Sequence, residues 1–223
     1  MTDTLIRAQN LSVGFPIGKG MFNKFVLKAV DNVTVSIEKG SFFGLVGESG
    51  SGKTTLGRAL LKAVPITGGS AHYSDGEVEY DLEDISKEQL RDYRKRAQLI
   101  FQDPYAALSP RMTVRDIIAE PLEVMKLTSS RAETDERVRE IAAKCRLNLE
   151  HLRRFPHAFS GGQRQRISIA RALVSDPKFI VADESVAALD VSIQADVLNL
   201  LKQLQQDLGL TFMFISHDLS VVA

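Results

Sequence analysis

The amino-acid sequence predicts an α/β protein with a mainly parallel sheet, preceded by an antiparallel β arm and interrupted by an inserted helical segment. Three short apolar runs without alternation, at residues 42–46, 179–182 and 211–215, are typical of strands buried on both faces of a parallel sheet. Apolar residues between Leu5 and Ile37 tend to alternate instead, which is the pattern of half-exposed antiparallel strands. The first and second runs are separated by a long, charged stretch of helical composition.

The arm and the first buried strand follow each other directly along the chain. A stretch rich in glycine and lysine, residues 16–24, is expected to be a loop between two arm strands. The apolar run 42–46 then leads into a glycine-rich turn and a helix-compatible segment, residues 54–64. This order predicts a strand, a loop and a helix.

The chain is interpreted as one domain, residues 1–223, divided into a core with its β arm (1–85 and 160–223) and a helical subdomain (86–159). The charges of the subdomain are typical of a solvated helix face. After the second buried strand, apolar residues recur on one helical face until Gly209, which predicts a crossover helix. These residues are Ile193, Val197, Leu200, Leu201 and Leu204.

Composition limits the class of protein. The 28 basic and 28 acidic residues balance, so no overall field attracts nucleic acid or anionic lipid. The lone cysteine, Cys145, has no internal disulfide partner and is best interpreted as a small buried residue of a helix. No apolar run approaches the roughly 20 residues that span a bilayer, and the N-terminus lacks a signal-peptide pattern. A cytoplasmic protein is expected.

The segment from Gly47 to Thr54 fits the pattern G-x-x-x-x-G-K-[ST] between a predicted strand and a predicted helix. Glycines let successive N–H groups point at phosphate oxygens, while Lys53 suits the β- and γ-phosphates and the Thr54 hydroxyl suits magnesium. A glycine-rich turn with a chance lysine is the alternative, which the flanking elements disfavour. The candidate nucleotide-binding residues are Gly47, Glu48, Ser49, Gly50, Ser51, Gly52, Lys53, Thr54 and Thr55.

Two carboxylates end the second buried strand. Asp183 and Glu184 follow four apolar residues at the carboxyl end, where ligands collect in open α/β sheets. Asp183 is predicted to hold magnesium, and Glu184 to orient or deprotonate an attacking water.

A second anion-binding helix terminus is predicted far from the first. Ser160 and Gln163 have the spacing of a capping box before the helix-forming run 164–174. Capping accounts for these two residues and leaves the adjacent Gly161 and Gly162 unexplained. Glycines lower helix stability but leave N–H groups free to approach an anion.

In this order the motifs resemble those of the nucleotide-binding subunit of an ABC transporter. The set comprises GESGSGKT, Gln102 after the strand-like Leu99-Ile100-Phe101, FSGGQRQR, IVADE, the turn ending at Asp190, and His217 in FISHDL. The segments FQDPYAALSPRMTVRDIIAEPL and ALDVSIQADVLNLL are similar to those of oligopeptide and dipeptide importers, in the nickel/peptide subfamily. The resemblance covers nearly the whole chain.

The resemblance implies a Mg²⁺-dependent ATPase that works as a head-to-tail pair. ATP on the Gly47–Thr54 loop of one subunit would be covered by Ser160, Gly161, Gly162 and Gln163 of the other, with Asp190 at the joint. Gln102 would contact magnesium or water, and His217 the γ-phosphate. An aromatic residue would stack on adenine: Phe15 fits best by position, and Phe25 is the alternative.

The chain departs from the family pattern in two places. Ser185 stands where proline is usual and Ala187 where serine is common, so the turn after Glu184 is held less rigidly. The family also continues beyond His217 through further strands, so the C-terminal end of the domain is expected to be missing at Ala223.

The implied partners are a second ATPase subunit, identical or related, two transmembrane permease subunits and, indirectly, a solute-binding protein. The chain would lie peripherally on the cytoplasmic face of the bacterial inner membrane, held only by permeases. Peptides are the default solute, although relatives carry nickel, glutathione, sugars or opine-like compounds. A soluble ABC-type ATPase acting on nucleic acid or ribosomes is the alternative, and a regulatory module without hydrolysis is a third possibility. The neutral charge balance disfavours an ATPase that acts on nucleic acid or ribosomes. The intact catalytic residues disfavour a regulatory module without hydrolysis.

Overall fold

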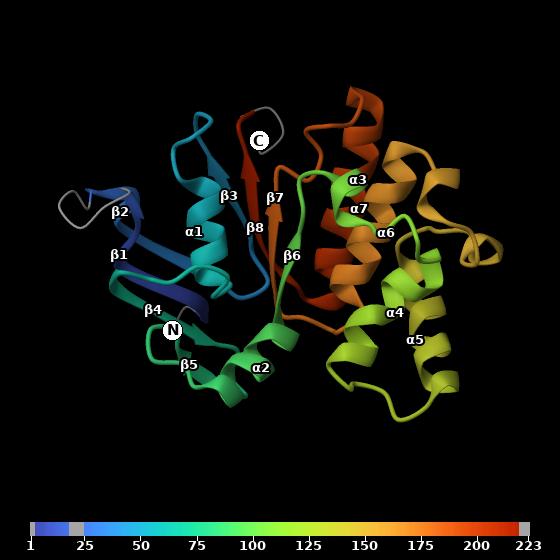
Figure 1. Ribbon diagram of the computed structural model, residues 1–223, viewed down its shortest axis with the longest axis horizontal. Coiled ribbons are helices and arrows are strands. Elements are labelled where there is room, and N and C mark those ends of the chain that lie inside the picture. Colours follow the sequence, from blue (N-terminus) through green and yellow to red (C-terminus); the bar gives the residue numbers. More distant parts are fainter. Residues whose placement is uncertain (1–2, 18–24, 219–223) are drawn as a thin grey trace.

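The computed structural model describes residues 3–17 and 25–218. Its strands form two sheets, one antiparallel and one parallel, with helices between and beside them (Figure 1). Part of the loop expected at 16–24 lies outside the described residues, since β1 includes residues 16 and 17. Among the described residues no helix is both long enough and apolar enough to cross a bilayer.

The antiparallel sheet has the order β2-β1-β4-β5. It confirms the predicted arm, because β1 and β2 pair antiparallel over most of their length. The sheet continues into two strands that the sequence pattern did not indicate, and these contain the buried Tyr73 and Tyr80. Its strands are β1 (Thr4–Ile17), β2 (Phe25–Glu38), β4 (Gly68–Ser74) and β5 (Glu79–Asp81).

The parallel sheet has the order β3-β8-β7-β6 and confirms the three strands predicted from apolar runs. Val46 pairs with Ser216 and Asp183 with Ile215, so the carboxyl ends of β3, β7 and β8 meet at one edge. Loops after these ends therefore form a common site. The strands are β3 (Phe42–Val46), β6 (Ala97–Ile100), β7 (Phe179–Asp183) and β8 (Thr211–Ser216).

Helix α1 (Lys53–Leu60) lies between the two sheets (Figure 1). Its Leu56 and Leu60 join one apolar core with residues of both sheets, including Val181 and Ile215. The helix was expected to continue to residue 64, but it ends at Leu60, and Lys62 adopts a left-handed φ of 54°. This core fixes the start of α1 beside the edge where the parallel strands end.

The opposite face of the parallel sheet carries a second core built from helices (Figure 1). The capping box of Ser160 and Gln163 is present at the start of α6, and Gly209 ends α7 in a left-handed conformation, as predicted. Cys145 is fully buried, and it is the C-cap residue of α5 rather than a residue within that helix. The helices are α4 (Val114–Val124), α5 (Arg131–Lys144), α6 (Gly161–Leu173) and α7 (Val191–Leu208).

The range 86–159 is less uniform than the expected helical subdomain. It opens with α2 (Lys87–Arg96), whose Tyr93 belongs to the core between the sheets, and with β6, which pairs with β7 in the parallel sheet. After Ile100, all the regular elements of this range are helices. The boundary at residue 86 is therefore too early. The short elements after it are α3 (Pro104–Ala107), η1 (Leu149–His151) and η2 (Pro156–Ala158).

Candidate nucleotide site

The loop from Gly47 to Thr54 connects β3 to α1 at the carboxyl edge of the parallel sheet. Gly52 precedes the helix with a φ of 91°, and a Cβ on it would lie 2.2 Å from the carbonyl oxygen of Ala29 in β2. Only glycine satisfies both this conformation and this contact. The loop is thus fixed against the arm, with the positive end of the α1 dipole at its base.

The Lys53 side chain folds back over the loop. Its Nζ donates hydrogen bonds to the carbonyl oxygens of Gly47 and Glu48 at 2.7 and 2.6 Å, and the residue is only 8% exposed. A buried ammonium is held here by backbone acceptors rather than by a carboxylate. Its positive charge therefore remains available to an anion at the loop.

The residue after the lysine reaches the end of β7. The Thr54 hydroxyl donates to Asp183 Oδ1 at 2.8 Å, joining positions 129 residues apart in the chain. Burial raises the pKa of Asp183, while the bond from Thr54 opposes that rise. The pair thus places a hydroxyl oxygen and a buried carboxylate side by side beneath the phosphate loop.

Glu184 stands next to this pair and has a side chain that is 17% exposed. Gln102 Nε2 donates to its Oε2 at 2.8 Å, and His217 Nδ1 lies 3.4 Å from its Oε1. The backbone of Glu184 has a φ of 44°, a left-handed value that costs a non-glycine residue about 1–3 kcal/mol. Such strain persists only where the surroundings fix it. The structure thus brings Gln102, Glu184 and His217 together from three separate loops.

The side chains of Thr54, Asp183 and Gln102 fit a magnesium ion that is bound together with phosphate. Among the described residues no group of three or more His, Cys, Asp and Glu side chains is arranged to hold a metal by itself. Mg²⁺ in phosphate-binding sites is typically held by one or two protein oxygens, by substrate phosphates and by waters. Thr54 and Asp183, with the nearby Gln102 amide, provide ligands of that kind.

The predicted second helix terminus is elsewhere in the chain. Helix α6 packs in the core on one face of the parallel sheet, whereas α1 packs in the core on the other face. Ser160 and Gln163 are exposed and exchange the two bonds of the capping box, at 3.3 and 3.0 Å. Asp190 is likewise exposed and starts α7 without a capping bond from its side chain. The structure of one chain therefore does not bring these residues to its own phosphate loop.

The two glycines of this terminus differ in their surroundings. A Cβ on Gly162 would lie 2.5 Å from Cγ2 of Ile193 in α7, so this glycine is required for close helix packing. A Cβ on Gly161 would meet Leu189 Cδ2 at 3.4 Å, which is an ordinary contact. The interpretation of both glycines as free N–H groups for an anion therefore omitted the packing requirement at Gly162.

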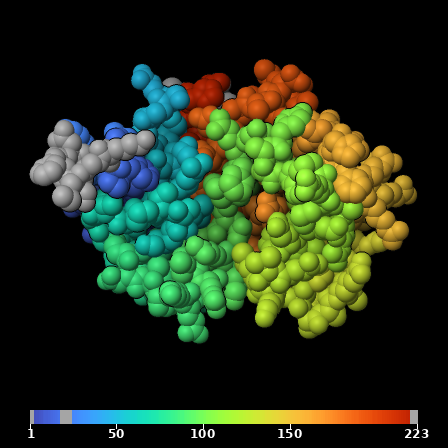
Figure 2. Space-filling model, viewed as in Figure 1, coloured from blue at the N-terminus to red at the C-terminus, as the bar shows by residue number. Residues whose placement is uncertain are grey.

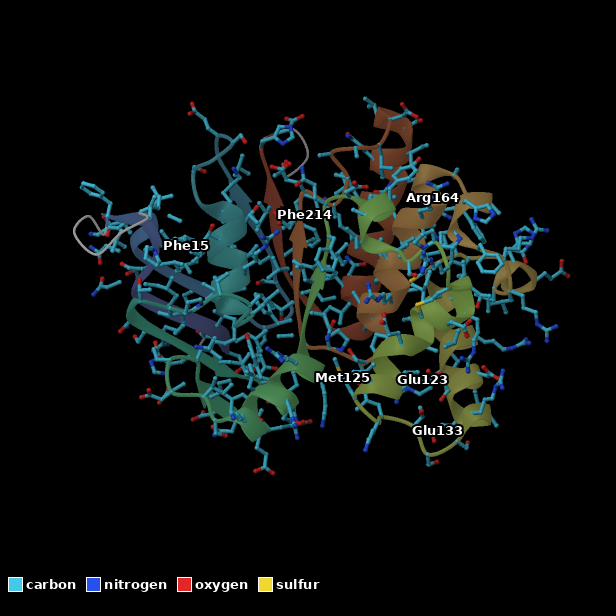
Figure 3. All side chains as sticks on the ribbon, viewed as in Figure 1. Phe15, Glu123, Met125, Glu133, Arg164 and Phe214 are labelled. Atoms are coloured by element: carbon cyan, nitrogen blue, oxygen red, sulfur yellow. The ribbon has the colours of Figure 1, made fainter. Side chains whose placement is uncertain are left out.

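Of the two candidate aromatic residues, Phe15 is closer to the loop. It pairs with Leu27, two residues before the Ala29 carbonyl that faces Gly52, and it packs against the core (Figure 3). Phe25 lies two residues before Leu27 in β2, and so farther from Ala29, and is 69% exposed. Thr55, in the first turn of α1, is half-buried.

Contacts that the sequence pattern did not indicate connect the Gln102 loop to α6. The Arg164 guanidinium lies 4.1 Å above the ring of Tyr105 in α3, and Arg171 donates to the carbonyl oxygen of Ala107 at 3.2 Å. Arg171 also pairs with Glu120 of α4 at 2.7 Å. Cation–π and long-range ion-pair partners depend on tertiary structure, so no periodicity could have revealed them.

Known proteins resemble this chain closely. A family model described as ABC transporter matches residues 30–187. The oligopeptide transport ATP-binding protein OppF of Streptococcus mutans is 53% identical over 221 residues, which cover 98% of this chain and 68% of that protein. The dipeptide transport ATP-binding protein DppF of Lactococcus lactis is 51% identical, with coverage of 98% and 68%.

Solved structures agree with the fold. The dimeric ATP-binding cassette MJ0796, in a post-hydrolysis state bound to ADP and Pi, aligns with a TM-score of 0.82 and 28% identity, covering 97% of this chain and 90% of that one. This structural similarity and the sequence relatives lead to one conclusion. The chain belongs to the ABC transporter family, as an ATP-hydrolysing nucleotide-binding subunit.

Proposed function

We propose that this chain hydrolyses Mg²⁺-ATP at an interface with a second ABC subunit and thereby energises the uptake of peptides or similar small solutes. The observation that carries the proposal is the convergence of Gln102 and His217 on Glu184, beside the Thr54–Asp183 pair. This group stands directly under a loop whose backbone and Lys53 suit phosphate.

Each side chain has a role that its position supports. Lys53 binds the β- and γ-phosphates, and Phe15 stacks on adenine. Glu184 accepts a proton from the attacking water or orients it, while His217, within 3.4 Å of that carboxylate, contacts the γ-phosphate and holds Glu184 in place. Magnesium, when bound by Thr54, Asp183 and Gln102, neutralises charge that develops on the phosphates.

A second subunit would complete the site. Because α1 and α6 pack on opposite faces of the parallel sheet, the start of α6, Ser160 to Gln163, is separated by that sheet from the helix that begins at the phosphate loop of the same chain. A head-to-tail pair would bring this terminus of one chain, with Asp190 beside it, to the ATP of the other. The partner is a second copy or a related chain.

The carboxylate assignment is tested with Glu184→Gln in the assembled transporter. The amide keeps the size of the side chain but cannot accept the proton, so ATP binding should persist while turnover falls by at least about a hundredfold. Glu140→Gln, the same change on an exposed face of α5, is the control and should retain normal turnover. ATPase rates and nucleotide-induced dimerisation are measured together. Full turnover in the Glu184 variant would refute the assignment.

A groove beside α4 suits a segment of a permease. Its volume is about 310 Å³, and Figure 2 shows it as a hollow between the green and yellow-green parts, with orange atoms at its floor. Phe101 and Val124 on its rim are 43% and 74% exposed, and Met125 lines it (Figure 3). The Glu120–Arg171 pair adds a polar contact, which suits an amphipathic helical segment. Together with Gln102 and the region from Tyr105 to Pro121, this groove is proposed to contact a membrane subunit on its cytoplasmic face.

The permease contact is tested by crosslinking from Val124→Cys in cells that express the whole transporter. A crosslink to a permease subunit is expected, whereas Glu140→Cys on α5 should give none. Absence of any permease adduct from Val124, with the complex intact, would contradict the docking surface. ATPase activity that responds to RNA or ribosomes instead would favour the alternative function.

The solute is proposed from the relatives, which are named for oligopeptide and dipeptide transport. Cells lacking this chain should lose uptake of a labelled tripeptide, and expression of the wild-type chain should restore it. The Glu184→Gln variant should not restore uptake. Normal tripeptide uptake without the chain would remove peptides as its solute.

A further inference from the structure

Two buried polar side chains have no hydrogen-bonding partner in the part of the chain that the structure describes. Gln165 of α6 is completely buried, and neither its amide oxygen nor its nitrogen is paired. Ser185, directly after Glu184, is 1% exposed and its hydroxyl is also unpaired. Buried polar groups without partners are rare and are costly to folding, so each calls for an explanation.

The two groups lie on the two sides of one interface. Gln165 follows Gly161 and Gly162 by one helical turn, so it shares their face of α6. On that face Gly161 lies near Leu189, in the segment that begins with Ser185, and Gly162 lies near Ile193, in the first turn of α7. Gln165 therefore faces the segment that connects Glu184 to α7.

The direction of α6 places Gln165 beside the carboxyl end of β7. The C-terminal end of α6 lies near Lys95, which precedes β6, because Ser175 bonds to the Lys95 carbonyl at 3.3 Å. Its N-terminal end lies near Leu189, which follows β7. Helix α6 thus runs antiparallel to β7, and its first turns stand beside the end of that strand, where Ser185 is buried.

Folding gives little reason to keep an amide at position 165. A methionine or leucine would fill the same space in an apolar core without an unpaired donor and acceptor. Polar residues that violate a packing rule of this kind tend to be found at functional sites. The neighbouring Glu184 backbone, in its strained left-handed conformation, also needs support from its surroundings.

We propose that Gln165 is a positioning residue that hydrogen-bonds to Ser185, directly or through one water, during hydrolysis and so fixes the turn that carries Glu184. This inference rests on the proposed role of Glu184 as the residue that activates water. The bond would orient the carboxylate without contacting ATP. Its loss should therefore lower kcat and leave KM nearly unchanged.

The test compares Gln165→Met, Ser185→Ala and the double variant in the assembled transporter, with Gln203→Met as a control. Gln203 is exposed in the C-terminal half of α7. Each single variant should lower kcat about threefold to tenfold, the range expected for one buried hydrogen bond, with KM within about twofold of wild type. The double variant should be no slower than the slower single variant, and its Tm should equal or exceed that of the wild type.

Other results would overturn the inference. A lower Tm with unchanged kcat in Gln165→Met would show a structural amide, and losses of kcat that multiply in the double variant would show independent residues. The proposed function fails separately, if Glu184→Gln retains turnover. If Glu184→Gln is inactive but Gln165→Met matches wild type, only the positioning role is wrong.

Discussion

The adjacent glycines at the start of α6 give a matched pair of substitutions with opposite expected effects. In Gly162→Ala the new Cβ would lie 2.5 Å from Ile193 Cγ2, so α6 and α7 must separate or Ile193 must move. In Gly161→Ala the new Cβ would meet Leu189 Cδ2 at 3.4 Å, and nothing needs to move. Both changes add one methyl group to the same helical turn.

The magnitudes follow from two opposing effects. Replacing a helical glycine by alanine contributes about 0.5–1 kcal/mol to stability, whereas overpacking a core costs about 1–3 kcal/mol. Gly162→Ala should therefore lose up to about 2.5 kcal/mol, which lowers Tm by up to about 10 °C in a domain of this size. Gly161→Ala should be unchanged or more stable by up to about 1 kcal/mol.

Urea denaturation of the two variants, followed by circular dichroism, measures the difference. In an Ile193→Ala background, which lacks the clashing methyl group, the cost of Gly162→Ala should largely disappear. Equal midpoints for Gly162→Ala and Gly161→Ala would refute the packing explanation. The same cost in the Ile193→Ala background would also refute it.

Three further predictions concern single groups. Because burial raises the pKa of Asp183, the native state keeps that proton to higher pH than the unfolded chain, and stability falls as pH rises between the two pKa values. Without Mg²⁺, Asp183→Asn should thus melt above wild type at pH 7.5, with the gap closing toward pH 4. Burial raises the pKa of Cys145 to about 12, so it should react with iodoacetamide only on unfolding. Phe15→Ala should weaken ATP binding about tenfold, and Phe25→Ala within about twofold; comparable losses in fluorescent-nucleotide titrations would contradict the Phe15 assignment.

Much of the parallel core was predictable because its signals are local. The runs that form β3, β7 and β8 are apolar at consecutive positions, and Ser160 and Gly209 mark helix ends by their own chemistry. Each of these signals acts within a few residues of the chain. Tertiary contacts therefore had little opportunity to override them.

The missed elements depend on distant partners. Strand β4 contains two glycines and a histidine and is held by its pairing with β1, more than 50 residues earlier, while β5 spans only three residues. Strand β6 has four residues after a highly charged helix, and the sequence indicated only its end, in the strand-like run from Leu99 to Phe101. The packing role of Gly162 likewise depends on Ile193, 31 positions later, which no local pattern contains.

The contacts around α3 give the site a physical connection to the groove. Gln102 bonds to Glu184, and three residues later the Tyr105 ring lies beneath Arg164 of α6. Arg171, two turns along the same helix, holds both the end of α3 and Glu120 of α4, which lines the groove. A change in the Glu184–Gln102 bond would therefore displace a segment fixed at both ends to α6. Because packed helices tend to shift as units rather than deform continuously, we expect such a displacement to reach the groove rim.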